Sequence, residues 1–402
     1  MTLTDHDFNK NSLDDEDLEL HKPETPLIPS VRIGSPITLA GVVTVMINGS
    51  NSTGITSPVP VDGFSDIMRI TTTAEKNPAG ESTTLIFKAI ADGDDLNAFL
   101  ADDPDAGSRY NSAVFQFLNY DIRSLGEAGK AGFAVGNDTH TMRDSGPTIE
   151  LDLNDKQGLV RIPHEKVVSF GVNDKVDFYV DINKDSIKPG TYPVAIDLFS
   201  FGQIGDGVLP DHRINNAIYR LELEESGDNT GVFEGTMEFV MLNQINVRNV
   251  GTYEGIDPIS DGIVLIVHND LTDEDSVRIN YFDRGADGVD TQIADQVEAP
   301  TTSGIVTFDY NNYKVADTVT VTLQDADMNT DVDTIDVFTV VDFVYPASSD
   351  FAGQRDSAYD QVGVAQYGRN SADENFGRIL DITIFPNTPN TCLLYTSPSP
   401  RD

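Results

Sequence analysis

Short apolar segments separated by turn-rich clusters recur along the whole chain. Runs with alternating or continuous apolar residues predict strands at AVFQFLNY, YRLELEE, GVFEGTMEFVML, DGIVLIVH, SVRINYF and DVFTVVDFVY. Clusters such as ESGDNTG, NDLTDED and DRGADG predict the turns between them. Because the strands are short, follow one another at roughly 8 to 12 residue spacing and include no convincing amphipathic helix, the pattern predicts an all-β protein built of serial β-sandwiches.

One ten-residue pattern occurs twice. TLTDHDFNKN (Thr2 to Asn11) and TLQDADMNTD (Thr322 to Asp331) share Thr, Leu, Asp, Asp and Asn at identical spacing, a strand end followed by D-x-D-x-N. The second copy follows a complete strand, KVADTVTVTL, whereas the first begins at the last residues of such a strand. We therefore expect Met1 to lie within a domain.

The repeats and turn clusters predict boundaries near residues 30, 160 and 300. We expect 1–30 to be the C-terminal part of a truncated preceding domain, 31–160 and 161–300 to be β-sandwich domains, and 301–391 to be a further, truncated domain. The last residues, CLLYTSPSPRD (392–402), resemble translated sequencing adapter, so we expect this tail to be non-native and to contribute nothing to folding. The only cysteine, Cys392, lies in it, which excludes native disulfides up to residue 391.

The charge balance restricts the partners. The chain has 402 residues, with 66 Asp and Glu against 26 Lys and Arg, a formal net charge of -40. Nucleic acid and anionic lipid would repel such a chain, so the expected partners are small cations. The longest apolar run, Ile37 to Ile47, has about half the ~20 residues of a membrane span. No signal peptide is visible, and we attribute this to N-terminal truncation.

Two acidic loops are candidate metal sites. Oxygen-bearing residues at alternate positions of a curled loop can converge on a hard cation, and Ca²⁺ takes such ligands at about 2.4 Å. The flanking strands and the missing turn glycine exclude an EF-hand, so we expect weak binding, in the ~0.1 to 1 mM range. The alternative is a solvated turn that closes a hairpin. The second-copy candidates are Asp325, Asp327, Asn329, Asp331, Asp333 and Asp336, and the first-copy candidates are Asp5, Asp7, Asn9, Asn11 and Glu16.

Two further groups of residues are candidates for binding or modification. The DRGADGVD turn contributes Asp283, Asp287 and Asp290 as another candidate calcium site. Three N-glycosylation sequons lie at Asn48, Asn51 and Asn137. Each would be meaningful only in an extracellular protein.

No catalytic constellation is present in the sequence. The six histidines are scattered, and no nucleophile elbow, P-loop or Rossmann glycine pattern occurs. We therefore predict a protein that is not an enzyme.

The stretch from about Arg213 to Tyr345 carries a more specific signal. It contains E-x-G-D-N-T-G-x-F-x-G and then L-x-D-A-D-x-N, and it resembles the surface-layer protein of ammonia-oxidising thaumarchaeal archaea. The resemblance is looser from Met1 to Gly207. It implies tandem immunoglobulin-like β-sandwiches, with 161–300 and 301–391 as such domains, and a secreted glycoprotein that assembles into a two-dimensional lattice on the cell surface. It also implies a role for the negative charge in enriching ammonium near the cell, although the charge could serve only solubility and bridging by divalent ions.

Other classes of protein remain as alternatives. A secreted calcium-dependent adhesin, or an accessory β-sandwich region of an extracellular hydrolase, would also combine β-sandwiches with acidic loops. A cytosolic halophile protein would explain the charge but not the repeats or the sequons. The uninterrupted gene would separate these, since a surface-layer gene extends through many more repeats and a hydrolase carries a catalytic domain.

Overall fold

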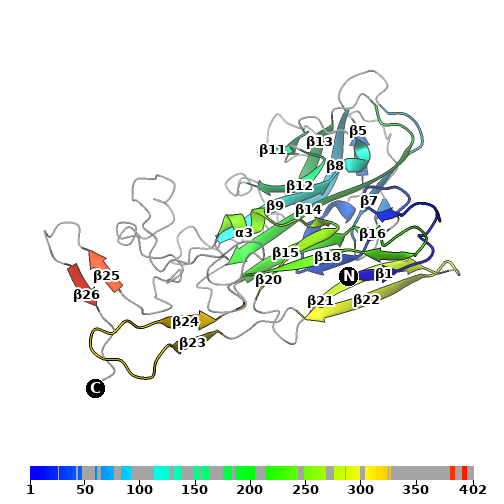
Figure 1. Ribbon diagram of the computed structural model, residues 1–402. Helices are drawn as coiled ribbons and strands as arrows, with labels where there is room; N and C mark the ends of the chain where they lie inside the picture. The colour runs from blue at the N-terminus through cyan, green and yellow to red at the C-terminus, as the bar shows by residue number, and fades with distance from the viewer. Residues whose placement is uncertain are drawn as a thin grey trace.

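The structure is a computed structural model in which packed β-sheets form the body of the molecule (Figure 1). It describes residues 1–25, 27–41, 44–47, 59–60, 65–76, 83–92, 113–126, 131–136, 148–153, 155–162, 175–182, 186–203, 213–242, 249–268, 276–285, 287–298, 304–324, 326, 381–384 and 392–395. The helical elements named along these ranges are α3 (Val250–Glu254) and the 3₁₀ turns η1 (Leu39–Gly41) and η2 (Arg123–Leu125). None of the described helices is long and apolar enough to cross a membrane.

One large sheet runs through the body in the order β12-β9-β14-β15-β3-β21-β22. Its strands are β12 (Gln157–Ile162), β9 (Ala113–Asp121), β14 (Gly190–Gln203), β15 (Arg213–Leu221), β3 (Ser30–Ile33), β21 (Ser276–Arg284) and β22 (Asp290–Glu298). Four short strands flank it: β4 (Ile37–Thr38), β6 (Val59–Pro60), β7 (Met68–Thr72) and β19 (Ile259–Ser260). Along this path every pairing is antiparallel.

The middle of this sheet is buried on both faces. Successive side chains of a strand point to opposite faces, and β14 is apolar on both. Its residues Val194, Ile196 and Leu198 belong to a first hydrophobic core. Its residues Ala195, Phe199 and Phe201 belong to a second core. The large sheet is therefore the shared layer between two cores.

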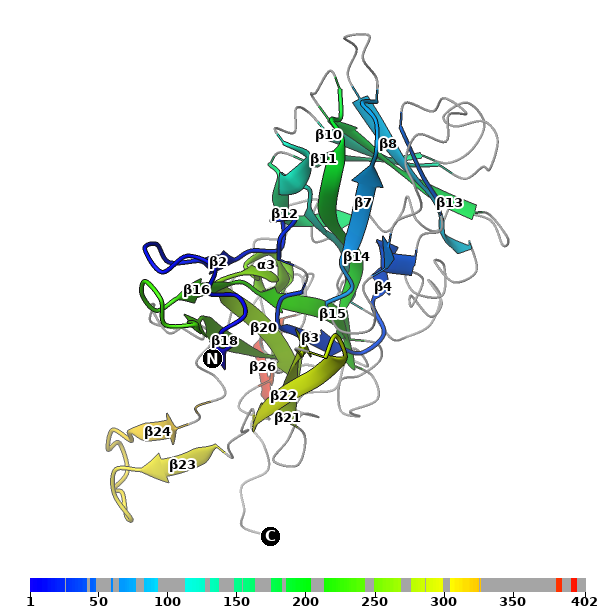
Figure 2. The same cartoon turned by 90° about the vertical axis from the view of Figure 1, so that its right-hand side faces the viewer.

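A separate layer covers each core. The first core is closed by a five-stranded sheet in the order β11-β10-β13-β8-β5, made of β11 (Thr148–Leu153), β10 (Ala131–Gly136), β13 (Lys175–Ile182), β8 (Thr83–Asp92) and β5 (Thr44–Ile47). The second core is closed by α3, by the parallel pair β18 (Thr236–Leu242) and β20 (Gly262–His268), and by a sheet of β1 (Thr2–Thr4), β17 (Val232–Glu234), β16 (Leu223–Glu225) and β2 (Asp17–Leu18). Figure 2 shows the two stacks, with β8, β10 and β13 at one end and β16, β18 and β20 at the other.

A buried ion pair joins the strands where the two cores meet. Arg220 of β15 and Asp197 of β14 are both fully buried, and the guanidinium binds both carboxylate oxygens at 2.5 and 3.0 Å. Arg220 also donates to the carbonyl oxygens of Ser65 and Asp66, and Asn119 donates to Asp197 at 3.2 Å. The pair therefore links β9, β14, β15 and the segment before β7.

The prediction of an all-β protein with β-sandwich sheets is confirmed, but two of the expected boundaries do not lie in linkers. The boundary near residue 160 falls inside β12, which pairs with β9 in the shared sheet. Residues 1–30, expected to end a separate preceding domain, belong to the second core through Leu3, Leu18 and Leu20. Both corrections have one cause: strands apolar on both faces need a sheet on each side, and distant segments supply it.

Two described hairpins lie apart from these layers (Figure 1). β23 (Ile305–Phe308) pairs with β24 (Val321–Gln324), and every residue of both strands is exposed. β25 (Asp381–Ile384) pairs with β26 (Cys392–Tyr395). Part of the expected non-native tail thus lies in a two-stranded hairpin, because the backbone of any extended segment can complete an antiparallel ladder. That the tail contributes nothing to folding stays a prediction.

Candidate metal centre

The first acidic loop is anchored by the strand that precedes it. β1 pairs with β17, with Leu3 opposite Phe233, and Leu3 is 5% exposed in the second core. Thr2 and Thr4 flank Leu3 and point outward, as the alternation of a strand requires. The loop that begins at Asp5 therefore starts from a fixed strand end.

The ESGDNTG turn packs against this loop and is hydrogen-bonded to it. The Glu225 carboxylate accepts hydrogen bonds from the backbone N–H groups of Thr230 (2.8 Å) and Gly231 (2.7 Å) through one oxygen, and from Glu16 N–H (3.2 Å) through the other. These bonds hold the pKa of Glu225 below its ordinary value although desolvation opposes them. The ESGDNTG turn, part of one motif of the family resemblance, is thus in direct contact with the loop of the first repeat copy.

Gly231 has to be glycine for this contact to form. Its φ is +60°, and a Cβ atom would lie 2.4 Å from the His6 imidazole nitrogen Nδ1. In the space so left, Asp5 N–H donates to the Gly231 carbonyl at 2.9 Å, and the Asn9 amide donates to Asn229 Oδ1 at 3.0 Å. The turn therefore fixes the position of Asp5.

Three carboxylates converge at this place. Asp5 and Asp7 of the loop and Asp283 of β21 each offer an oxygen, and these oxygens all lie within 4.8 Å of one another. The Tyr281 hydroxyl donates to Asp5 Oδ2 at 2.8 Å, and Asp7 N–H donates to Asp5 Oδ1 at 3.0 Å. Residues from opposite parts of the chain thus meet in one acidic cluster, which we call the Asp5–Asp7–Asp283 cluster.

The cluster is electrostatically unbalanced. The pKa of Asp283 is raised, first by desolvation and then by the charges of Asp5 and Asp7. The pKa of Tyr281 is raised as well, by burial, by its bond to Asp5 and by the same carboxylates. Among the described residues, no Lys, Arg or His forms an ion pair with the three carboxylates. A bound cation would remove this repulsion.

The spacing of the three oxygens suits a calcium ion. Ca²⁺–oxygen distances of 2.3 to 2.6 Å place ligands on opposite sides of the ion about 4.6 to 5.2 Å apart, and other ligand pairs closer. Separations up to 4.8 Å lie within this range. The Asp5–Asp7–Asp283 cluster could therefore supply three of the 6 to 8 oxygens that calcium takes, with water and backbone oxygens as the others.

The structure gives Glu16, one member of the first predicted ligand set, a different role, and it shows hydrogen bonds at Asn9 and Asn11. Glu16 does not join the cluster, because its Oε1 accepts the N–H groups of Lys10 (3.1 Å) and Asn11 (2.6 Å) and so closes the loop. Asn9 donates to Asn229, and Asn11 bonds Asp14 and Leu13. These three residues shape the loop by hydrogen bonds.

The DRGADGVD site is also divided. Asp283 joins Asp5 and Asp7, whereas Asp287 Oδ1 accepts from Val289 N–H at 3.0 Å and Asp290 forms an exposed ion pair with Arg284 at 3.7 Å. The turn therefore does not gather its own three carboxylates. The other candidates lie outside the described residues: Asp325, Asp327, Asn329, Asp331, Asp333 and Asp336 of the second loop, and Asn48, Asn51 and Asn137 of the sequons.

Sequence reasoning missed the combination of Asp283 with the first loop, and it missed Tyr281. A partial signal was present, because Tyr281 and Asp283 are two residues apart in SVRINYF and its continuation, and so point to one face of a strand. The position of β21 beside β3, which brings that face to the loop, depends on pairing across some 250 residues and has no local signature.

Comparisons with known proteins add little to this geometry. No protein-family model matches the sequence, and the comparison with curated proteins gave no match. Among solved structures, the chain is similar to CtCBM11, whose solution structure was described together with its dynamics and binding studies. That likeness covers 44% of this chain and 96% of the other, at 11% sequence identity and a TM-score of 0.19. A likeness of this degree supports no argument about function, so the metal centre stands on its own contacts.

Proposed function

We propose that this chain is a structural part of an extracellular cell-surface lattice, and that calcium bound at the Asp5–Asp7–Asp283 cluster stabilises it. The observation that carries the proposal is the convergence of three carboxylates, from a loop at residues 5–7 and a strand at 276–284, within 4.8 Å and without a described cationic partner. The surface-layer resemblance supplies the lattice and its location at the cell surface.

The role of the cation follows from what it would connect. Asp5 and Asp7 belong to the loop after β1, and Asp283 belongs to β21 of the large sheet. A cation between them would tie the edge sheet β1-β17-β16-β2 to the large sheet. Because it binds the folded arrangement and not the separated segments, it raises the free energy of unfolding by mass action.

The charge of the chain fits a repeated, exposed array. A net charge of -40 opposes close packing of identical copies unless cations lie between them. Divalent ions can bridge copies, and small monovalent cations such as ammonium can accumulate within about 10 Å of the carboxylates at 0.1 M salt. The proposal therefore expects assembly of the chain to depend on divalent cations.

Calorimetric titration with calcium tests the metal centre. The wild-type chain should give a saturable heat of calcium binding with a Kd of about 0.1 to 1 mM. Asp283→Asn should lose the part of this heat that comes from the Asp5–Asp7–Asp283 cluster. Asp295→Asn is the matched control, because Asp295 lies exposed on the neighbouring strand β22 and carries the same charge. Equal heats for wild type and Asp283→Asn would remove the site.

Assembly is tested separately from binding. Electron microscopy and sedimentation of the chain, with calcium and with a chelator, should show ordered sheets or large assemblies only with calcium. A chain that binds calcium at the cluster yet stays monomeric at all calcium concentrations would retain the metal centre and overturn the lattice role.

A further inference from the structure

The hairpin of β23 and β24 carries an apolar face that is open to solvent. Cross-strand partners share a face and successive residues alternate between faces, so the register places four apolar side chains together: Val306, Phe308, Val321 and Leu323. Each of the four is more than half exposed. Because a two-stranded hairpin is at best marginally stable alone in water, we expect this face to pack against a partner.

β24 repeats the sequence of β1. In the ten-residue pattern that occurs twice, Leu323 matches Leu3, and Val321, just before the pattern, matches Met1. Leu3 is buried in the second core, and Met1 packs against that core. The two positions that are covered in β1 are therefore exposed in β24, and the surroundings of β1 indicate the kind of surface that fits β24.

The backbone of β1 is bonded on one side. Across β1 and β17, Gly235 N–H donates to the Met1 carbonyl at 3.1 Å. Hydrogen-bonded positions alternate along an antiparallel pair, so Leu3 also directs its backbone groups to β17, whereas Thr2 and Thr4 direct theirs away from it. Since β1 ends the sheet β1-β17-β16-β2, the described part of the chain places no strand beside this outer edge.

The backbone of β24 is bonded on the opposite side. Asp309 N–H donates to the Thr320 carbonyl at 3.1 Å. By the same alternation, Thr322 uses its backbone groups on β23, whereas Val321 and Leu323 direct theirs to the other edge of β24, where no described strand pairs. The open edge of β24 thus presents the backbone groups that β1 uses on β17.

We propose that the β23–β24 hairpin of one molecule replaces β1 beside β17 in a second molecule of this chain. Val321 and Leu323 would then pack in the second core at the positions of Met1 and Leu3. The contact reuses the β1–β17 interface and adds β23 at the edge that β1 leaves open, which gives the sheet order β23-β24-β17-β16-β2. The D-x-D-x-N spacing that follows β1 also follows β24 in the sequence, so the replaced segment and its replacement match beyond the strand.

Direct pairing of β24 with the outer edge of β1 fits less well. The open backbone groups are those of Thr2 and Thr4 on β1 and those of Leu323 on β24. Residues opposite each other in a ladder share a face, so Leu323 would point outward with the two threonines, away from the second core. Burial of the apolar face therefore favours replacement of β1.

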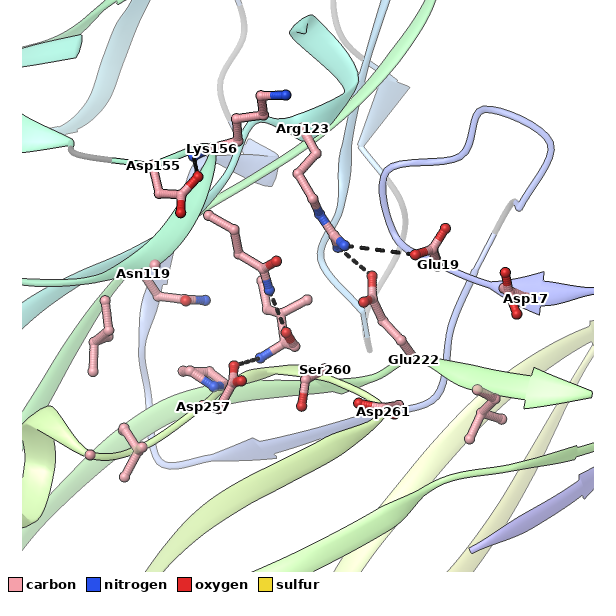
Figure 3. A pocket seen from close by; sticks show the side chains of 18 of the residues that line it. Asp17, Glu19, Asn119, Arg123, Asp155, Lys156, Glu222, Asp257, Ser260 and Asp261 are labelled. Atoms are coloured by element: carbon pink, nitrogen blue, oxygen red, sulfur yellow. Dashed lines mark hydrogen bonds and ion pairs between the residues drawn. The ribbon is translucent and has the colours of Figure 1, made fainter. Parts of the chain in front are cut away.

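The acceptor strand β17 does not depend on β1 for its position. Beyond β17, the sheet is tied to the body near β16 and β2, where Glu222 and Glu19 form ion pairs with Arg123 (Figure 3). Leu20 N–H also donates to Glu222 at 2.8 Å. Phe233 of β17 is fully buried in the second core. β17 would therefore keep its place when β1 is replaced.

Replacement joins different surfaces of the two molecules. The donor is the hairpin of β23 and β24 and the acceptor is β17, so each molecule can donate to one neighbour and accept from another. Such heterologous contacts continue from molecule to molecule unless a ring closes. The inference rests on the proposed function for its setting, because it names one contact within the proposed lattice.

Cross-linking of two full-length variants in calcium-containing buffer tests the replacement. One variant carries Thr322→Cys and the other Glu234→Cys, and both carry Cys392→Ser, so a disulfide between the two variants reports these positions alone. Thr2, which matches Thr322, lies opposite Glu234, and such a non-hydrogen-bonded pair has its Cα atoms about 4.5 Å apart. That separation allows a disulfide, so the mixed disulfide should form under mild oxidation.

Two controls locate the contact. Thr307→Cys in place of Thr322→Cys should give no mixed disulfide, because Thr307 lies opposite Thr322 on β23, one strand farther from β17. Leu323→Asp in the donor should abolish the mixed disulfide, whereas Ile305→Asp, the same change on the other face of the hairpin, should not. Since every residue of β23 and β24 is exposed, neither change affects a buried side chain.

The outcomes separate this contact from the lattice itself. No mixed disulfide with Thr322→Cys, an equal yield with Thr307→Cys, or a yield that Leu323→Asp leaves unchanged would each overturn the proposal. Ordered sheets that form in calcium without this disulfide would overturn the contact and leave the lattice role intact. The disulfide in molecules that form no sheets would support the contact and overturn the lattice role.

Discussion

The buried pair of Arg220 and Asp197 gives the sharpest prediction about stability. Both side chains are 0% exposed, and the guanidinium uses its donors on two Asp197 oxygens and on the carbonyls of Ser65 and Asp66. Asp197→Asn keeps the shape of the side chain but leaves the arginine charge buried without its counter-ion. Breaking such a pair by removal of one partner costs about 3 to 5 kcal/mol.

Chemical and thermal unfolding of the variant measure this cost. At about 2 to 4 °C per kcal/mol for a cooperative unit of 150 to 250 residues, the melting temperature of Asp197→Asn should fall by about 6 to 20 °C. Arg220→Met should destabilise similarly, because among the described residues it leaves buried Asp197 with the Asn119 amide as its side-chain donor. The double variant Asp197→Leu, Arg220→Met should lose much less than the sum of the two, since a buried pair replaced by apolar residues is often neutral in stability.

Two results would refute this reasoning. If Asp197→Asn lost less than about 1 kcal/mol of unfolding free energy, the pair would contribute no more to stability than an exposed surface ion pair does. Additive losses in the double variant would show that the two side chains do not interact in the folded chain.

Three further predictions concern the loop, the tail and pH. Gly231→Ala should displace His6 and Asp5, and so weaken calcium binding at the metal centre and lower the melting temperature. Gly288→Ala is the control: this glycine also has a positive φ but has open space around it, so the change should lower stability without changing calcium binding. Deletion of residues 392–402 should leave the melting temperature of the body unchanged, because β26 pairs with β25 in an isolated two-stranded hairpin and such hairpins are marginal; a loss of several degrees would show that the tail supports the body. The pKa of Glu222 is raised in the folded chain, so the unfolded chain releases this proton first and stability falls as pH rises from about 4 through the folded pKa. In Glu222→Gln, the free energy of unfolding should fall less steeply over this pH range. An unchanged slope would contradict the raised pKa of Glu222.

The sequence predicted the strands well because their signals are local. Alternating or continuous apolar runs correspond to β9, β15, β18, β20 and β21, and the ESGDNTG cluster is a turn whose Gly227, Asn229 and Gly231 all have positive φ. The stacking was not predictable in the same way. β14 is apolar on both faces, but nothing in its own residues says that β9 and β15 flank it or that residues 1–30 complete the second core.

The candidate site shows the same division between local and distant information. The D-x-D-x-N spacing identified Asp5 and Asp7, and the turn composition identified Asp283, but as parts of different sites. Glu16 was chosen for its charge and position, whereas its hydrogen bonds to Lys10 and Asn11 give it a role in loop closure. Which carboxylates share a cation depends on strand pairing, which a single sequence does not reveal.

Terbium luminescence tests the metal centre most directly. The chain has 13 Tyr and no Trp, and the Tyr281 hydroxyl lies 2.8 Å from Asp5 Oδ2, so a Tb³⁺ ion at the cluster would be excited through this tyrosine. Wild-type chain should show tyrosine-sensitised emission that calcium displaces, and both Asp283→Asn and Tyr281→Phe should lose most of it, while Asp295→Asn keeps it. Emission of equal intensity in wild type and Asp283→Asn would contradict a cation at the Asp5–Asp7–Asp283 cluster.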